Sequence, residues 1–169
     1  MLDEFSVYIN AAPEIVYPFL SEADKIIKWR DTDSAAYGLH YKGPARVGDL
    51  MTVTPKGLFP AIKRWTMVAR VDEVVAGARV VHKYIAGPLL GTDTWVVGAA
   101  GAGTRMAKIV DYEITGLLNG FLWRLAGRRR HATACRKVLG KLKSLVETAN
   151  NAEAADEPAV GAGPATGAG

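Results

Sequence analysis

The stretch SVYINAAPEIVYPFLSEADKIIKW, residues 6–29, combines one strand pattern with two short helix patterns. Apolar and polar side chains alternate at its beginning, and Phe5, Val7 and Ile9 share one face, as in a half-buried strand. Pro13 then suits the first turn of a helix, because its missing N–H would have no partner there. Two short apolar-periodic stretches follow and end on a tryptophan. The chain therefore begins with a strand and two short helices.

After residue 29 the hydrophobic period becomes two, and the segments are separated by Gly, Pro or Asp-rich breaks. The strand candidates are SAAYGLHYKG, VGDLMTVTPKG, IKRWTMVARVDEV, ARVVHKYIAGP, GTDTWVVGAA and TRMAKIVDYEIT. Short strands at this spacing predict an antiparallel meander. The clearest tight connection is GAAGAGT, from Gly98 to Thr104.

From Gly116 the period becomes helical, with apolar side chains at spacings of three, four or seven and no proline. These side chains are Phe121, Leu125, Ala132, Cys135, Leu139, Leu142 and Val146. The pattern predicts a helix of roughly 30 residues, which can bury its apolar stripe only against the sheet. We therefore expect one α+β domain over residues 1–149, a curved antiparallel sheet wrapped around a long C-terminal helix. Residues 150–169 have few large apolar groups, which predicts a disordered tail.

The composition is that of an ordinary soluble protein, with 49% apolar and 22% charged residues. No apolar run approaches the roughly 20 residues that a membrane span needs. Asp3 and Glu4 stand where a signal peptide would carry positive charge, so we expect a cytoplasmic protein. A single cysteine, Cys135, excludes an internal disulfide.

No metal or cofactor site is expected. His40, His82 and His131 lie on different elements, without the spacing of a metal-ligand set. No Gly-x-Ser-x-Gly nucleophile motif is present. The GAAGAG segment precedes a strand pattern, whereas a dinucleotide-binding loop needs a following helix, so this segment is a hairpin turn.

The positive charge is concentrated on the long helix, where residues 117–149 hold eight basic residues and one acidic residue. The basic residues are Arg124, Arg128, Arg129, Arg130, Arg136, Lys137, Lys141 and Lys143. A helix with one buried stripe needs a solvated outer face, and these side chains supply it. Weak contact with an anionic membrane surface stays open as an alternative. Nucleic acid is disfavoured, because aromatic side chains suited to base stacking are missing elsewhere.

Three segments carry a family resemblance through their order: INAAPEIVYPFLSEADKIIKW, VGDLMTV and GAGTRMAKIVDYEITG. With them the chain resembles the START-like, or SRPBCC, superfamily, in its polyketide cyclase/dehydrase and lipid-transport branch. The likeness runs from about Phe5 to Val146. It implies a helix-grip fold, in which sheet and helix enclose an apolar cavity and the two short helices plug one end.

The resemblance implies a ligand without naming a reaction, since some relatives close polyketide rings, others carry lipids or quinones, and many sense small ligands. We expect this chain to bind a hydrophobic small molecule or lipid for transport, sequestration or sensing. A cyclase or dehydratase is the alternative. The expected cavity walls are Tyr37, Trp65, Met67, Tyr84, Trp95, Tyr112, Ala132 and Cys135. The competing interpretation is that the large side chains among them fill the space completely.

His82 and Arg128 are the expected polar anchors and the catalytic candidates. His82 lies between apolar neighbours without an evident carboxylate, so it is either a general acid or base or a hydrogen-bonded core residue. Arg128 would meet a ligand carboxylate or enolate, a structural partner such as Asp111 or Glu113, or water at the helix edge. In the last strand, either Lys108 or Asp111 faces inward. The oligomeric state stays open.

Overall fold

The computed structural model describes residues 1–33, 35–56 and 65–156, apart from the side chains of residues 154 and 156. Its first half contains β1 (Leu2–Ile9), α1 (Pro13–Val16), α2 (Pro18–Ser21), α3 (Ala23–Arg30), β2 (Ala35–Leu39) and β3 (Leu50–Pro55). Its second half contains β4 (Met67–Val75), β5 (Arg79–Ala86), β6 (Leu89–Ala100), β7 (Gly103–Ile114), α4 (Leu117–Leu122), the π-helical segment η1 (Trp123–Gly127) and α5 (Arg128–Asp156).

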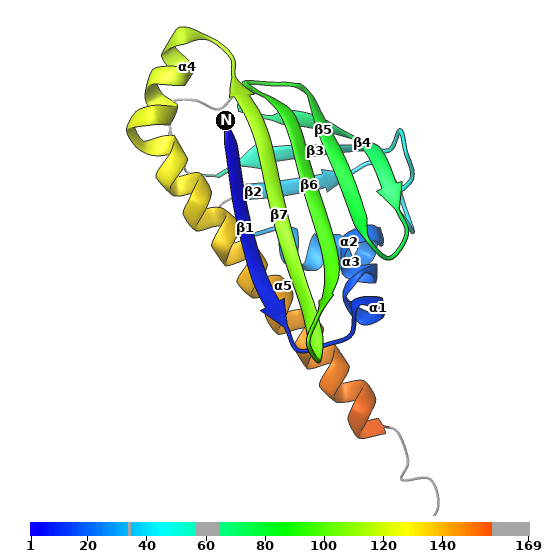
Figure 1. Ribbon diagram of the computed structural model, residues 1–169. Coiled ribbons are helices and arrows are strands. Elements are labelled where there is room, and N and C mark those ends of the chain that lie inside the picture. Colours follow the sequence, from blue (N-terminus) through cyan, green and yellow to red (C-terminus); the bar gives the residue numbers. More distant parts are fainter. Residues whose placement is uncertain (34, 57–64, 157–169) are drawn as a thin grey trace, which may run out of the picture.

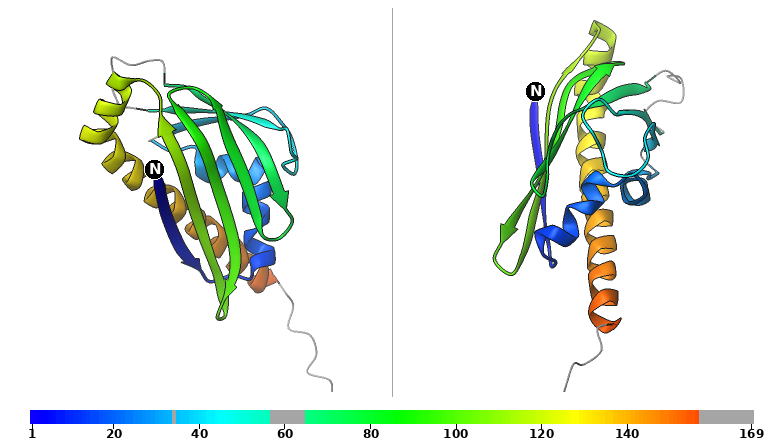
Figure 2. Two further views of the ribbon diagram at one scale, coloured as in Figure 1. Left: turned by 45° about the horizontal axis from the view of Figure 1, so that its top comes forward. Right: turned by 90° about the vertical axis from the view of Figure 1, so that its right-hand side faces the viewer.

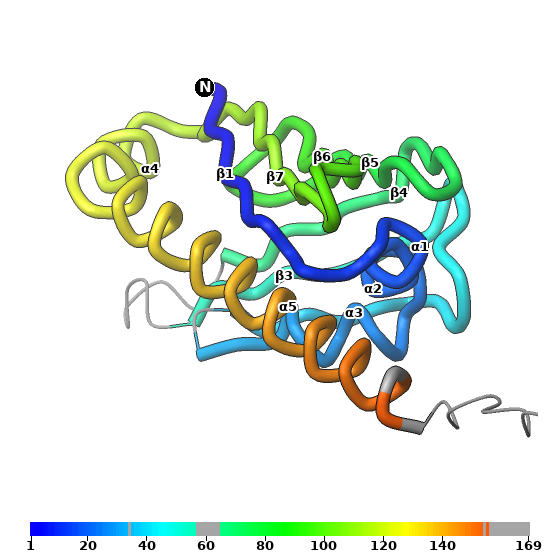
Figure 3. Tube along the Cα trace, turned by 60° about the horizontal axis from the view of Figure 1, so that its bottom comes forward, coloured from blue at the N-terminus to red at the C-terminus, as the bar shows by residue number. Residues whose placement is uncertain are grey.

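The strands form one seven-stranded antiparallel sheet in the order β1-β7-β6-β5-β4-β3-β2. The sheet curls, and the long C-terminal helix runs along its concave side (Figure 1 and Figure 3). Strands β2 to β7 follow one another along the chain, whereas β1 pairs with β7 from Leu2↔Asp111 to Ile9↔Thr104. This arrangement confirms the predicted α+β helix-grip fold. The tight connection between β6 and β7 is also confirmed, because Ala100 pairs with Gly103.

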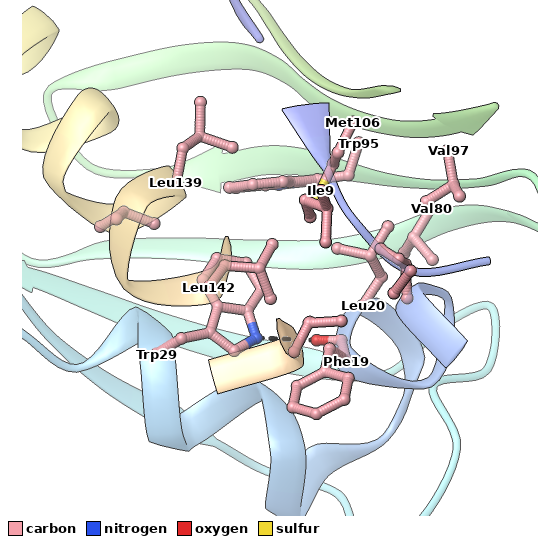
Figure 4. Close-up of a cluster of buried hydrophobic side chains, with 14 of the residues drawn as sticks. Ile9, Phe19, Leu20, Trp29, Val80, Trp95, Val97, Met106, Leu139 and Leu142 are labelled. Carbon is pink, nitrogen blue, oxygen red and sulfur yellow. Dashed lines mark hydrogen bonds between the residues drawn. The ribbon is translucent and has the colours of Figure 1, made fainter. Parts of the chain in front are cut away.

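The three short helices close the end of the sheet that lies away from α4 (Figure 2). The indole Nε1 of Trp29 donates a hydrogen bond to the carbonyl of Phe19 at 2.8 Å, which ties α3 to α2. Its ring packs edge-on against Trp95 of β6, with centroids 5.0 Å apart. Leu139 and Leu142 of α5 join these side chains in one hydrophobic cluster, which we call the lower cluster (Figure 4). The space between the sheet, the three short helices and α5 is therefore filled by a hydrophobic core.

A second group of buried apolar side chains, the upper cluster, lies toward α4. Its members are Met51, Val53, Trp65, Met67, Ala69, Tyr84, Leu89, Val110, Tyr112 and Trp123. Trp65 and Trp123 stack with ring centroids 6.4 Å apart. These rings join the loop before β4 to the C-terminal helix.

The apolar stripe of the C-terminal helix differs from its predicted course before α5. Phe121 and Leu125 were expected to be buried, but their side chains are 63% and 71% exposed. Trp123 and Gly127 are buried in their place. The reason is the π-helical segment, whose i→i+5 hydrogen bonds make a wider turn and rotate the residues before it. Beyond this segment Cys135 is buried, as predicted.

The end of the helix also differs from the prediction, since α5 continues to Asp156 instead of ending at residue 149. Alanine is a strong helix former, which supports these additional turns. The rest of the predicted disordered tail, residues 157–169, lies outside the described residues, as does the start of the predicted strand over residues 62–74. Among the described residues, none of the helices combines the length and the apolar character needed to cross a bilayer.

Candidate ligand-binding site

A cavity of about 160 Å³ lies between the upper half of the sheet and α5. Strands and the loop before β4 contribute Ala35, Tyr37, Val53, Pro55, Trp65, Met67, Tyr84, Leu89, Lys108 and Val110. The C-terminal helix contributes Trp123, Arg130, His131, Ala134, Cys135 and Val138, and Thr32 and Lys56 complete the wall. An apolar cavity of roughly 150 Å³ is large enough for benzene. This space therefore suits a compact apolar group.

Small side chains on the helix explain why the space is left open. Ala134 and Cys135 face the sheet at the level of Tyr37 and Tyr84, while the larger Leu139 and Leu142 fill the lower cluster. Protein interiors are otherwise close-packed, so a thin patch on a helix opposite a curved sheet leaves volume unfilled. The predicted thin patch is present, but it consists of Ala134 and Cys135 instead of Ala132 and Cys135.

A row of polar side chains crosses the inward face of the sheet between the two clusters. On β5, His82 lies between Val80 of the lower cluster and Tyr84 of the upper cluster. Asp93 on β6 pairs directly with His82 across the strands. Lys108 on β7 contacts Asp93, with Nζ 3.0 Å from Oδ2, and both side chains are almost fully buried.

Arg30, at the C-terminal end of α3, is the fourth member of this group, and we call the four residues the polar layer. Its side chain is buried, and its Cζ lies 4.7 Å from the ring centroid of Trp95 and 5.8 Å from that of Tyr37. Its Nη1 donates a weak hydrogen bond to Met51 Sδ at 3.4 Å. Among the described residues, its Nε and Nη2 have no hydrogen-bond partner.

The charges of the polar layer follow from burial and from mutual contacts. Burial lowers the pKa of His82 to about 3, and the Arg30 charge adds to this effect, so the imidazole is neutral at pH 7. Burial opposes ionisation of Asp93, but Lys108 and Arg30 outweigh it and lower the carboxyl pKa. Asp93 likewise outweighs the effect of burial on Lys108 and raises the ammonium pKa. The layer therefore holds two cations and one anion.

Hydrogen-bond donors dominate the polar part of the cavity wall. Burial raises the pKa of the Tyr37 and Tyr84 hydroxyls, so both keep their protons. Burial lowers the pKa of His131 to about 4, which leaves a neutral ring 3.5 Å from the sulfur of Cys135. Lys108 reaches the same cavity from the polar layer. None of the described lining residues is acidic.

Five of the ten residues predicted for the site line this cavity: Tyr37, Trp65, Met67, Tyr84 and Cys135. That they bind a ligand stays a prediction. The other five lie elsewhere.

His82 and Trp95 face inward but lie deeper than the cavity. His82 belongs to the polar layer, and Trp95 packs on Trp29 in the lower cluster. The carboxylate that the sequence did not reveal beside His82 is Asp93, which the strand register places opposite it.

Tyr112, Arg128 and Ala132 do not reach the cavity either. The Tyr112 hydroxyl donates to Asp3 Oδ2 at 2.8 Å, and Arg128 Nη2 donates to Asp3 Oδ1 at 2.9 Å. The partner of Arg128 is therefore Asp3 on β1, instead of Asp111 or Glu113. Arg128 and Ala132 border a separate outer groove. The π-helical segment and the β1–β7 pairing together place Arg128 at this outer edge.

Sequence reasoning did not single out Arg30, Asp93 or Ala134. For Asp93, alternation along β6 was a usable signal, since Asp93 and Trp95 lie on the same face. No sequence pattern indicated that Arg30 would be buried, because an arginine at a helix end is ordinarily solvated. The open choice in β7 is resolved in favour of Lys108, while Asp111 faces outward beside the terminal amine of Met1. Among the described residues, no group of three or more His, Cys, Asp or Glu side chains is placed to hold a metal ion.

Comparison with known proteins agrees with this architecture. A family profile described as polyketide cyclase / dehydrase and lipid transport matches residues 4–147. The chain therefore belongs to the polyketide cyclase/dehydrase and lipid-transport family. No curated protein sequence matches it.

Several solved structures share the fold at low sequence identity. The solution structure of the KanY protein (ms6282) is 22% identical, with a TM-score of 0.70, over 87% of this chain and 97% of its own. TTHA0849 from Thermus thermophilus is 20% identical, with a TM-score of 0.69, over 88% and 99%. Ms6760 from Mycobacterium smegmatis is 10% identical, with a TM-score of 0.65, over 88% and 92%. These similarities concern the fold alone.

Proposed function

We propose that this protein binds a small apolar molecule in the cavity between the upper sheet and α5, for transport, sequestration or sensing. The observation that carries the proposal is the cavity of about 160 Å³ between the lining faces of the sheet and the helix. Its aromatic walls, with the stacked pair Trp65 and Trp123, suit a flat ring. Family membership agrees with a ligand of this kind.

The apolar contact area sets the expected affinity. Burying a single-ring ligand of about 150–200 Å² at about 25 cal/mol per Å² gives roughly 4–5 kcal/mol before polar contacts. Loss of translational freedom removes part of this gain. We therefore expect a dissociation constant of about 1 mM or weaker for an apolar ring alone, and tighter binding for a ligand with matched polar groups.

Binding is favoured over catalysis by the pair of residues that the enzyme hypothesis used. His82 is buried in the polar layer, whereas Arg128 is exposed and paired with Asp3 on the outer face. A general acid or base and a carbonyl-polarising group must reach one point in the site. These two side chains do not share such a point.

Ethylbenzene, followed by the indole N–H signals of Trp65 and Trp123 in an NMR titration, tests the proposal. Ala134→Phe places a ring in the cavity and is expected to weaken binding at least tenfold. The matched control is Ala132→Phe, which makes the same change two residues away toward the outer groove and is expected to bind as the wild type does. Native mass spectrometry of the purified protein would detect a retained molecule directly. Equal binding by both variants would refute the location, and no binding by the wild type would refute the function.

A second candidate function is docking to the anionic inner face of a cytoplasmic membrane, and a separate observation favours it. Four large apolar side chains on α4 and η1 are exposed, namely Leu117 at 98%, Leu118 at 69%, Leu125 at 71% and Phe121 at 63%. Leu117 and Leu118 each share a side of α4 with Phe121, at i+4 and i+3, and Leu125 follows in η1. An exposed apolar patch beside arginines fits an anionic lipid surface, where each nearby Lys or Arg contributes about 1 kcal/mol.

Liposome sedimentation tests this docking. The double variant Leu118→Asp, Phe121→Asp is expected to lose binding to vesicles with about one third anionic lipid, where each bilayer-facing charge costs a few kcal/mol. Val47→Asp is the control, because Val47 is also 67% exposed but lies in the loop before β3. Absence of wild-type binding at low salt would refute the docking and leave the cavity proposal intact.

A further inference from the structure

We propose that the ligand of the cavity carries one carboxylate, which binds at the level of Lys108 and is balanced by the excess positive charge of the polar layer. This inference rests on the proposed function, because it names the chemical class of the ligand at the same site.

The first argument is the charge balance of the buried groups. Arg30 is 1% exposed, Asp93 1%, His82 0% and Lys108 5%. Asp93 contacts Lys108 directly, which pairs one cation with the one anion. Among the described residues no carboxylate lies within ion-pair distance of Arg30. A buried charge without a counterion is costly, so the folded protein has one positive charge to neutralise.

The second argument is the surroundings of Arg30. Its Cζ lies within 6 Å of three ring centroids, at 5.2 Å from Trp29, 5.8 Å from Tyr37 and 4.7 Å from Trp95. Aromatic faces stabilise a cation but do not neutralise it. Tyr37 also lines the cavity. The Arg30 charge therefore acts on the cavity across a single ring, in surroundings where screening by salt is weak.

The third argument is that the polar side chains of the cavity wall are hydrogen-bond donors. Lys108 presents an ammonium to the cavity, and the protonated hydroxyls of Tyr37 and Tyr84 line it nearby. Charge-assisted hydrogen bonds from such donors suit an oxygen anion. The apolar body of the ligand would then lie toward Trp65 and Trp123 in the upper cluster. One end of the cavity recognises charge and the other recognises a ring.

A matched pair of compounds tests the inference without a variant. The compounds 4-ethylbenzoate and 4-ethylbenzamide have almost the same shape and differ by one negative charge. The titration follows the indole N–H signals of Trp65 and Trp123, so that binding to the basic outer face of α5 is not counted. It is run at pH 7 in 0.5 M NaCl, which screens exposed charges. We expect 4-ethylbenzoate to have a dissociation constant at least tenfold lower than that of 4-ethylbenzamide.

The variant Arg30→Met assigns this preference to the polar layer. It removes the unpaired charge and is expected to lower the benzoate-to-benzamide preference to about twofold or less, without changing the affinity for the amide. The control Arg129→Gln removes the same charge from the exposed outer face and is expected to keep the full preference. If Arg30→Met does not fold, equal binding of the two compounds by the wild type still overturns the inference, whereas a preference could also come from Lys56 or Arg130, which line the same cavity.

The outcomes separate the two proposals. Equal binding of both compounds by the wild type would overturn the inference and leave the proposed function standing. A preference that persists in Arg30→Met would also overturn it. If neither compound nor ethylbenzene shifts the indole signals, the proposed function fails, and the inference fails with it.

Discussion

Replacement of His82 by leucine should weaken the acid sensitivity of the fold by a defined amount. The ring is fully buried, and it is faced by Arg30 from α3, Asp93 from β6 and Lys108 from β7. Burial, followed by the Arg30 charge, lowers its pKa from 6.5 to about 3. Between pH 7 and pH 5 the folded protein therefore keeps this ring neutral, whereas the unfolded chain binds a proton there.

The size of the effect follows from this difference in proton binding. Because the folded-state pKa lies below the unfolded-state value, stability is lost as pH falls below about 7. An unfolded imidazole with a pKa near 6.5 goes from about one quarter protonated at pH 7 to almost fully protonated at pH 5. Integrated over this window, the loss is about 2 kcal/mol for His82 alone. This loss of stability is the same for any folded-state pKa of His82 well below 5.

The assay is urea unfolding followed by tryptophan fluorescence at pH 7 and pH 5, at one ionic strength. His82→Leu should lose about 2 kcal/mol less than the wild type between the two pH values, because leucine binds no proton. If His82→Leu showed the same pH dependence as the wild type, the folded-state pKa of His82 would be close to its unfolded-state value, and the neutral buried imidazole of the polar layer would be wrong.

Two further predictions concern backbone strain and thiol reactivity. Gly91 has a φ of +131°, and an added Cβ would meet the backbone of Asp111, so Gly91→Ala should destabilise the fold by about 3 kcal/mol in urea unfolding. Gly98→Ala, in open space on the same strand, should change stability by less than about 1 kcal/mol, and an equal loss would contradict this assignment. Burial raises the pKa of the Cys135 thiol, so iodoacetamide at pH 8 should label it at least 100-fold more slowly in the folded than in the urea-unfolded protein. Similar rates in both states would show that the thiol is accessible.

Among the described residues, five side chains have unpartnered buried polar atoms; one is Tyr41, and the other four gather in one part of the molecule. Arg30, His82, Asp93 and Trp95 each have at least one buried polar atom without a hydrogen-bond partner among the described residues, and they lie on neighbouring elements beside the cavity. Most buried polar groups in proteins are paired, so such a gathering calls for a specific reason. Perturbed ionisable groups beside a cavity are typical of functional sites. A ligand carboxylate would supply the missing anion at this point.

Local patterns were sufficient for the order of elements and for most of the inward-facing residues. Alternation along β5 placed Val80, His82 and Tyr84 on one face, because successive side chains of a strand point to opposite sides. The long apolar-periodic segment after Gly116 predicted a helix that could be covered only by the sheet. These features depend on residues close together in the chain, which is why they could be read before the structure was known.

Contacts between distant segments decided the site itself. The register between β5 and β6 set Asp93 against His82, and the packing of α3 against the sheet buried Arg30, 63 residues before Asp93 in the chain. The wide turn of η1 moved Phe121 and Leu125 to the surface and brought Trp123 to the cavity. Strand register and helix rotation are set by the packing of whole elements, and side-chain periodicity does not encode them. The unpaired buried charge of Arg30 beside the cavity therefore arises only when these distant segments pack together in the folded protein.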